Sequence, residues 1–263
     1  MRYDPERIQS RLEEETAGLV LVYKETTDST NNDAKKAAEE GAAGGFVFLT
    51  ENQTAGKGRR GNTWNSRAED CLTFTVLVRP KLSPEKFSLL APVMGLAVSE
   101  SCEALSGLKS LIKWPNDVLI DSRKVCGILV EAGSRMDYAV IGCGINTGFG
   151  LPPEELADKA VYLSEAAGRE ISREDMLAEV LKRFAAYERI LEKEGSFVSL
   201  KPLYESRLVN IGRQVSVISP KGSVTALCLG IDEDGALLIK KENGETEKVF
   251  AGEVSVRGIY GYV

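Results

Sequence analysis

The sequence predicts an α+β protein in which a mixed, largely antiparallel sheet is flanked by helices and is followed by a small β-barrel. Two patterns predict this fold class. Up to about residue 209, short strand-like runs alternate with longer runs of helical periodicity. From about Asn210 the helical runs stop, and short strands separated by turn residues follow one another. A chain of 263 residues has room for one large domain and a small appended one.

The first two elements are a helix and a strand, expected at about Pro5–Glu15 and Leu19–Lys24. The run DSTNNDAKKAAEEG then indicates a turn that leads into a second helix. Ser29 or Thr30 is expected to cap this helix, and Asp33 to bond back from its first turn. Two further strands are expected on either side of the run ENQTAGKGRRGNTW, over Phe46–Thr50 and Cys71–Val78.

In the middle of the chain, Ser83 and Pro84 suit the cap and first turn of a helix with apolar residues at helical spacing. Three strands follow, and the DSRK turn between the first two predicts an antiparallel hairpin. These strands are expected over Val118–Ile120, Lys124–Glu131 and Tyr138–Ile145. Ser172 and Asp175 open a long amphipathic helix. Dipeptides such as Asn243-Gly244 then mark hairpin turns in the C-terminal part.

Composition limits the class of protein. Hydrophobic residues make up 43% of the chain and charged residues 27%, as in soluble globular proteins. The first residues lack the apolar core of a signal peptide, and we expect no run near the roughly 18 apolar residues of a membrane span. The five cysteines form no CxxC pair, which argues against a disulfide framework or a thiolate metal site. The sequence therefore predicts a cytoplasmic protein without membrane contact and without a protein-bound metal.

The chain contains no histidine, so Ser-His and Cys-His catalysis and imidazole metal ligation are excluded. Any chemistry must use Lys, Arg, Asp, Glu or hydroxyl groups. The net charge of −6 argues against a protein that coats nucleic acid. A local basic patch in an acidic chain indicates a small anionic ligand instead.

That patch is the loop GKGRRG, Gly56 to Gly61. Its three glycines allow backbone conformations and close approaches that a Cβ would prevent. Lys57, Arg59 and Arg60 supply three cations within four positions. Backbone N–H groups and guanidinium groups of this kind bind phosphates or carboxylates. The loop has neither the Walker A spacing nor a dinucleotide fingerprint, so taken alone it predicts a generic anion site, or only a solvated basic turn.

Three further runs accompany the loop. KWPNDVLI begins at Lys113 and places a proline and two polar side chains before a strand, which is either a turn with a capping side chain or a functional site. RKVCGILVEA puts Lys124 at the start of a buried strand, where a lysine is commonly solvated. VIGCGINTG combines strand glycines with Asn146, which suggests either a bulge or a close approach of backbone to a ligand.

The ordered set DSTN, QTAGKGRRGNTW, KWPND, RKVCGILVE and GINTG closely resembles the biotin–protein ligase family, in the short form without an N-terminal DNA-binding domain. The resemblance covers nearly the whole chain. It implies a class II synthetase-like catalytic domain over residues 1–209 and an SH3-like β-barrel over residues 210–263. It also implies that biotin and ATP are joined to give biotinyl-5′-AMP, and that the biotinyl group passes to a lysine of a biotin carboxyl carrier protein domain, as in acetyl-CoA carboxylase. Mg²⁺ is expected with the nucleotide.

The resemblance assigns site residues by motif. The biotin-binding set is Ser29, Thr30, Asn31, Gln53, Lys57, Gly58, Arg59 and Lys124. The set for ATP or the adenylate is Arg59, Arg60, Trp64, Asn116, Asp117, Lys124 and Asn146. Within these sets Arg59 is the main cation and Lys124 contacts the biotin carboxyl oxygen and the α-phosphate. Asp117 is the candidate to orient or deprotonate the acceptor lysine, which makes Arg59, Lys124 and Asp117 the catalytic set. A biotin carboxylate is ionised at pH 7 and needs no general base, which fits a chain without histidine.

Two positions depart from the family pattern: Asn62 stands where a further basic residue is common, and Lys57 stands where Arg is common. A lipoate-type ligase, a biotin-responsive repressor and a non-catalytic biotin binder remain as alternatives. Only about 25 residues precede DSTN, too few for a winged helix-turn-helix, so DNA binding is not expected. The sequence leaves the oligomeric state open between a monomer and a homodimer.

Overall fold

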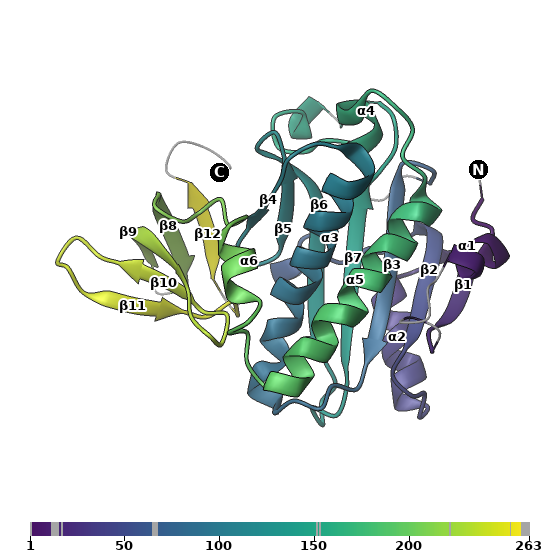
Figure 1. Ribbon diagram of the computed structural model, residues 1–263, viewed down its shortest axis with the longest axis horizontal. Helices are drawn as coiled ribbons and strands as arrows, with labels where there is room; N and C mark the ends of the chain where they lie inside the picture. The colour runs from purple at the N-terminus through teal and green to yellow at the C-terminus, as the bar shows by residue number, and fades with distance from the viewer. Residues whose placement is uncertain are drawn as a thin grey trace.

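The computed structural model describes residues 2–11, 16, 18–64, 68–150, 152, 154–220, 222–252 and 254–258, and these residues form two β-sheets and several helices (Figure 1). The larger sheet has seven strands in the order β1-β2-β3-β7-β6-β5-β4. β1 and β2 are parallel, and every other neighbouring pair in this sheet is antiparallel. The strands are β1 (Val20–Thr27), β2 (Phe46–Gln53), β3 (Cys71–Val78), β4 (Ser110–Lys113), β5 (Asp117–Ile120), β6 (Arg123–Ala132) and β7 (Ala139–Asn146). The predicted mixed, largely antiparallel sheet is confirmed.

Helices cover both faces of this sheet. The α-helices are α1 (Pro5–Arg11), α2 (Thr30–Glu39), α3 (Leu90–Ser106), α4 (Leu163–Ala167), α5 (Arg173–Glu194) and α6 (Lys201–Glu205). Short 3-10 helices are η2 (Arg59–Gly61), η3 (Pro84–Leu89) and η4 (Glu154–Leu156). Figure 1 shows α3 and α5 side by side in front of the sheet.

Strand alternation explains which helix lies on which face. In β3, Phe74 and Val76 pack into the main core, which also contains residues of α3 and α5. The alternate residue Leu77 packs instead with Ala34 and Ala38 of α2. The two faces of β3 therefore point into two different cores, with α2 on one side of the sheet and the pair α3 and α5 on the other.

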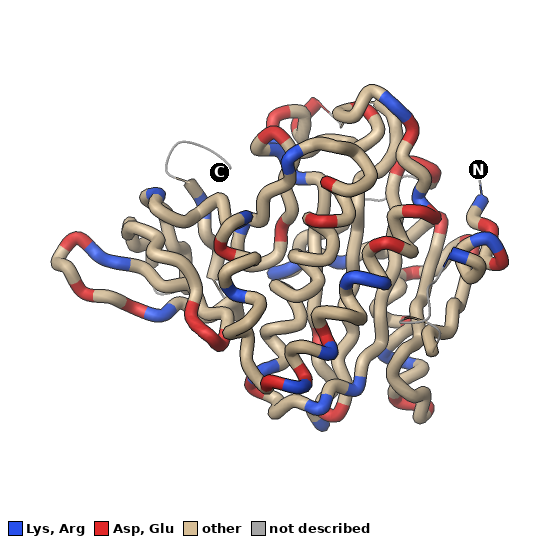
Figure 2. Tube along the Cα trace, in the orientation of Figure 1, with Lys and Arg blue, Asp and Glu red and all other residues tan. Residues whose placement is uncertain are grey.

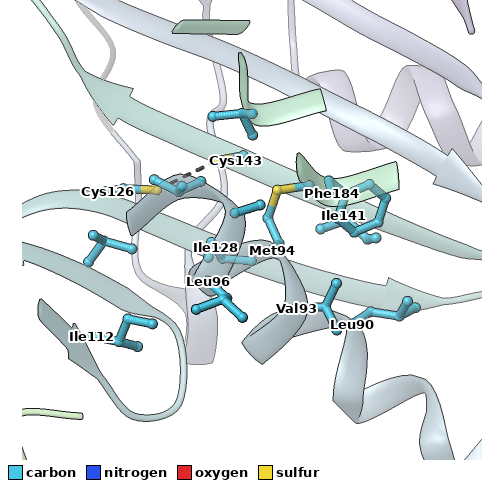
Figure 3. Packing of buried hydrophobic residues seen from close by; sticks show 14 of the residues in the cluster. Leu90, Val93, Met94, Leu96, Ile112, Cys126, Ile128, Ile141, Cys143 and Phe184 are labelled. Carbon is cyan, nitrogen blue, oxygen red and sulfur yellow. Dashed lines mark hydrogen bonds between the residues drawn. The ribbon is translucent and has the colours of Figure 1, made fainter. Parts of the chain in front are cut away.

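The main core is closely packed around α3 (Figure 3). Met94 and Leu96 of this helix and Ile141 of β7 are fully buried. Burial of such a side chain stabilises the fold by about 2 kcal/mol. Cys126 and Cys143 lie here too, with their sulfur atoms 3.5 Å apart, and burial raises the pKa of the Cys126 thiol well above its usual value. These cysteines are therefore inert core residues, as the scattered spacing predicts.

The segment Pro84–Ser106 corrects one expectation. By length and composition it could cross a membrane, with a mean hydropathy of 1.2 over its most apolar window. Because 67% of that window is buried inside the protein, the segment is the central core helix of the fold. Its apolar character serves packing on the sheet, α5 and α4.

The C-terminal sheet has five antiparallel strands in the order β11-β10-β9-β8-β12. The strands are β8 (Gln214–Ser219), β9 (Gly222–Ile231), β10 (Leu237–Lys240), β11 (Thr246–Val249) and β12 (Ser255–Gly258). In the described residues β11 and β12 stand at the two edges and are not paired with each other. The structure therefore shows the predicted strands and turns as a sheet and does not show the closed barrel.

Most predicted elements are confirmed, with differences at their ends. Ser172 caps α5 by accepting from the Asp175 N–H at 3.2 Å. Ser29 occupies the cap position of α2 but its side chain makes no capping bond. Instead, the side chain of Asp28 accepts from the Ser29 N–H at 2.7 Å. Asp33 does not bond back to the cap, because it pairs with Lys24 of β1. The end of the predicted first helix, at residues 12–15, lies outside the described residues.

Candidate functional site

A row of paired residues runs across the seven-stranded sheet. From β1 to β4 its members are Lys24, Thr50, Thr73, Gly144, Gly127, Asp117 and Lys113. Paired residues on neighbouring strands project to the same face, so the whole row faces the α2 side of the sheet. The row has two glycines at its middle and charged residues beyond them on β5 and β4. This arrangement leaves a depression over the glycines.

A cavity of about 450 Å³, open at its mouth, lies over these glycines. It is bounded by the start of α2, the end of β2, the loop Gly56–Gly61 and the middle of β3, β6 and β7. Predicted site residues that line it are Ser29, Thr30, Asn31, Gln53, Lys57, Gly58, Arg59, Trp64, Asn116 and Lys124. Motifs that are far apart in the sequence are thus brought to one place.

Trp64 lies on the floor of the cavity. A Cβ added to Gly144 would lie 2.3 Å from the indole, and one added to Gly127 would lie 3.1 Å from it. The indole therefore rests directly on the two glycines, so the close approach at Gly144 is to a side chain of this protein, and an approach to a ligand stays a prediction. Its Nε1 is buried against the Gly144 backbone and has no hydrogen-bond partner among the described residues. The Lys124 ammonium lies 5.5 Å from the ring centroid, on the side toward β5.

One end of the cavity is lined by polar side chains of α2 and β2. Gln53 Oε1 accepts from the Thr30 N–H at 2.9 Å and from the Thr30 hydroxyl at 3.1 Å. These bonds fix the orientation of the Gln53 amide and satisfy an N–H at the start of α2. Ser29 and Thr30 are almost fully buried, at 2% and 3% exposure. This end can recognise a compact polar group through hydrogen bonds.

The other end is cationic. Lys124 Nζ forms an ion pair with Asp117 Oδ1 at 2.6 Å. Arg59 Nη1 donates to Asn116 Oδ1 at 3.0 Å, which ties the basic loop to the KWPND run. Burial lowers the pKa of the Arg59 guanidinium, while Asp117 raises it and Arg60 lowers it. These groups can bind a phosphate or carboxylate. The Lys57 ammonium lies at the opposite end of the cavity, where it donates to Asn32 of α2 at 2.5 Å.

The basic loop also contacts the C-terminal part of the chain. Arg59 donates to the carbonyls of Ala251, Gly252 and Val254, at 3.2 Å for Gly252 and 3.4 Å for Val254. Arg60 donates to Ser255 Oγ at 2.6 Å. Asn62 bonds back to the Arg59 carbonyl at 2.9 Å, so it stabilises the turn and adds no charge. The loop therefore lies between the cavity and the residues just before and within β12.

Three predicted residues do not line the cavity. Arg60 points to Ser255 at the surface. Asp117 lies behind Lys124, as its ion-pair partner. Asn146 is 8% exposed, accepts from the Cys71 thiol at 3.6 Å and donates to the Lys124 carbonyl at 3.4 Å. Asn146 thus contacts the start of β6.

Sequence reasoning missed three residues at the site. Lys113 is only 5% exposed and is paired with Asp117 across the sheet. Burial lowers the pKa of its ammonium to about 8; Asp117 acts to raise this pKa, and Lys124 and Arg257 act to lower it. Thr75 and Glu131 bond to residues of α2 beside the cavity. Thr75 and Glu131 face the α2 side of predicted strands, so alternation along those strands could have found them once their neighbours were known, whereas Lys113 lies on β4, which was not predicted.

Comparison with known proteins identifies the architecture. Residues 23–146 match the biotin/lipoate A/B protein ligase family, and residues 211–257 match the biotin protein ligase C-terminal domain. The bifunctional ligase/repressor BirA of Bacillus spizizenii is 32% identical over 254 residues, which cover 95% of this chain and 78% of that protein. The chain belongs to the biotin protein ligase family.

Two other relatives of this biotin protein ligase family member are similar over most of their length. The biotin–[acetyl-CoA-carboxylase] ligase of Mycobacterium tuberculosis is 33% identical over 234 residues, covering 87% of this chain and 85% of that one. A structure of the biotin protein ligase of Aquifex aeolicus in complex with biotin and ATP superposes with a TM-score of 0.80 at 32% identity. That match covers 90% of this chain and 98% of the Aquifex chain.

Proposed function

We propose that this biotin protein ligase family member activates biotin with ATP as biotinyl-5′-AMP and transfers the biotinyl group to a lysine of a carrier protein. The observation that carries the proposal is that one cavity brings together polar side chains of α2 and β2 and the cations of Lys124 and Arg59. The polar end at Thr30 and Gln53 suits the neutral ureido ring of biotin. The cationic end at Lys124 and Arg59 suits the carboxylate and the α-phosphate.

In the first step a biotin carboxylate oxygen attacks the α-phosphorus, the bond to the β-phosphate breaks, and pyrophosphate leaves. Both reactants are anions, so the barrier contains their repulsion. Lys124 and Arg59 are fixed cations at the place where the two anions must meet. They reduce this repulsion and hold the carboxylate in line for attack. This step requires no general base, since the carboxylate is ionised at neutral pH.

In the second step the acceptor lysine amine attacks the acyl carbon and AMP leaves. The amine must first lose a proton. Asp117 is the carboxylate beside Lys124, and we propose that it orients or deprotonates the incoming amine. Lys124 would then stabilise negative charge on the acyl oxygen.

Mg²⁺ is proposed to arrive with ATP. Over the described ranges no group of three or more Asp, Glu, His or Cys side chains is placed to hold a metal ion. This fits an ion bound chiefly by phosphate oxygens and water, as Mg²⁺ commonly is. Bound in this way it would neutralise part of the charge on the phosphates.

The test is ATP–pyrophosphate exchange driven by biotin, run beside the same assay with lipoate. We expect exchange with biotin at a rate at least tenfold above that with lipoate. Exchange driven equally well by lipoate would favour a lipoate-type ligase. Tight biotin binding without any exchange would indicate a binder that does not catalyse.

The finer assignments are proposals as well. We propose a carrier domain of acetyl-CoA carboxylase or a related biotin enzyme as the acceptor, a cytoplasmic location and no DNA binding. The last is supported by the net charge of −6 and by the mixed distribution of charges in Figure 2. We also propose a catalytic domain over residues 1–209 and a C-terminal domain over residues 210–263. Gel-shift assays with promoter DNA test for DNA binding. Sedimentation separates a monomer from a homodimer.

A further inference from the structure

A chain of hydrogen bonds lies behind the polar end of the cavity and connects α2 to β3 and β6. At its outer end the Lys35 ammonium and Asn31 Nδ2 both donate to Glu131, with the Asn31 bond at 2.8 Å. Asn31 Oδ1 accepts from the Thr75 hydroxyl at 2.6 Å, and Thr75 Oγ1 lies 2.8 Å from Thr30 Oγ1. Thr30 lines the cavity, so this chain joins a charged pair to the cavity wall.

The middle of the chain is buried away from solvent. Asn31 is 4% exposed and Thr75 is 0% exposed. Asn31 lies against the backbone of Gly142, where an added Cβ would come within 2.3 Å of its Oδ1. Burial alone would raise the pKa of Glu131, but the bonds from Asn31 and Lys35 bring it below the usual carboxyl value. Glu131 is therefore ionised at neutral pH and can only accept hydrogen bonds.

The ionised carboxylate determines the direction of every bond that follows. Asn31 must turn Nδ2 toward Glu131, which leaves its Oδ1 toward Thr75. The Thr75 hydroxyl has one proton, and since Oδ1 can only accept, that proton goes to Asn31. The Thr30 proton then goes to Thr75 or to Gln53 Oε1, which lies 3.1 Å away. In both cases Thr30 offers the cavity an oxygen that accepts.

We propose that Glu131 is a positioning residue. Through Asn31 and Thr75 it keeps the Thr30 oxygen, on the cavity wall, as an acceptor for ligand N–H groups, and so selects a cyclic urea. The inference rests on the proposed function, in which that urea is the ureido ring of biotin. It also changes the expected role of Asn31. Its amide bonds to both Glu131 and Thr75, so the role that we assign to Asn31 is to orient Thr30.

Replacing the Glu131 carboxylate by an amide removes the fixed order of donors and acceptors along the chain of hydrogen bonds. In Glu131→Gln the new side chain can donate as well as accept, so the Asn31 amide can turn over at little cost. Asn31 would then donate to Thr75, and Thr75 to Thr30. The Thr30 oxygen would have one lone pair fewer for the ligand. A loss of one ligand hydrogen bond corresponds to roughly a tenfold weaker binding.

The experiment measures KM for biotin and for ATP in biotin-dependent ATP–pyrophosphate exchange. For Glu131→Gln we expect KM for biotin to rise about tenfold and KM for ATP to stay within twofold. In an Asn31→Ala background the same substitution should have no further effect, because Glu131 acts through Asn31. Effects of the two substitutions that multiply would overturn the proposal, as would an equal rise in both KM values.

Two control variants separate bond direction from simple anchoring. Lys35→Met removes the ammonium and keeps the carboxylate, so KM for biotin should change less than threefold. A Lys35→Met effect as large as that of Glu131→Gln would mean that only the ion pair matters, and would also overturn the proposal. Glu40→Gln is the matched control on the exposed end of α2 and should leave both KM values unchanged. If the unaltered chain shows no biotin-dependent exchange, the proposed function fails, and not this inference alone.

Discussion

Lys124 has the most constrained surroundings of the cationic residues in the cavity. Its ammonium is held 2.6 Å from Asp117 and 5.5 Å from the Trp64 ring, and a Cβ on Gly127 would lie 2.8 Å from it. A carboxylate, an aromatic face and a glycine therefore fix the position of one charge. Such a pre-positioned cation stabilises a transition state better than a mobile one does.

We expect Lys124→Ala to lower biotin-dependent pyrophosphate exchange at least 100-fold, the size of effect found for one electrostatic contact in an active site. The exposed Lys109, which lies just before β4, provides the control Lys109→Ala with unchanged exchange. Binding of biotin alone, followed by calorimetry, should weaken much less than exchange. Normal pyrophosphate release by Lys124→Ala would contradict the role given to this residue.

At the scale of a single element, α5 carries a carboxyl group in unfavourable surroundings. Glu188 lies on the partly buried side of this helix, beside a cavity that Arg79, Lys81 and Glu192 also line. Burial, with a smaller effect of Glu192, raises the pKa of Glu188 from 4.5 to about 7. Between pH 4.5 and about 7, Glu188 therefore keeps its proton in the folded state and has lost it in the unfolded state.

Stability should fall as pH rises from 4.5 to about 7, because the folded pKa of Glu188 is the higher one. Above that range Glu188→Gln should be more stable than the unaltered chain by up to about 3 kcal/mol, and below pH 4.5 the two should differ little. Denaturant unfolding at pH 5 and pH 8 measures this. The exposed carboxyl of Glu194, changed to Gln at the end of α5, is the matched control. An equal effect of Glu188→Gln at both pH values would contradict the assignment.

At the scale of the whole molecule, the two sheets meet at the site. Trp114 Nε1, in the KWPND run, donates to the Gly235 carbonyl at 3.0 Å, and Asn210 Oδ1 accepts from the Trp114 N–H at 3.0 Å. Arg59 adds its bonds to the carbonyls of residues 251, 252 and 254. The C-terminal sheet thus contacts both motifs that are expected to bind the nucleotide.

Removing the Arg59 guanidinium should release this contact. In Arg59→Ala we expect backbone amides near residues 251–254 to exchange with deuterium at least tenfold faster, measured by mass spectrometry. Lys57→Ala is the control, because Lys57 bonds to Asn32 of α2 and not to the C-terminal segment. Protection that stays unchanged in Arg59→Ala would show that the segment is held by other contacts. Release of biotinyl-AMP should also be faster in this variant.

The sequence predicts the fold well wherever local signals are strong. The hairpin between β5 and β6, the Ser172 cap and the turns at Gly235 and Gly244 all follow from short-range chemistry. The strand β4 was missed, because four residues directly after a helix carry little periodicity. The predicted capping bond of α2 was wrong, because the first N–H of the helix, that of Thr30, bonds to Gln53 of β2, a residue distant in sequence.

The motif residues that line the site could be predicted from the sequence, but the residues that bond to them could not. Ten of the residues chosen from the motifs line one cavity. Thr75, Glu131 and Lys113 could not be chosen, because their importance depends on which residues stand opposite them. The hydrogen bond between Asn31 and Glu131 joins residues 100 positions apart, and no short run of sequence carries that information.

The row of paired residues across the seven-stranded sheet limits how this chain can vary in length. Because side chains alternate along a strand, the loss of one residue from the middle of β7 would turn Gly142 and Gly144 away from α2. Cys143 and Ile145 would then occupy the place of the two glycines and fill the space of Trp64. Insertions and deletions should therefore be tolerated in the connections and at the outer ends of strands, while β6 and β7 keep a fixed length.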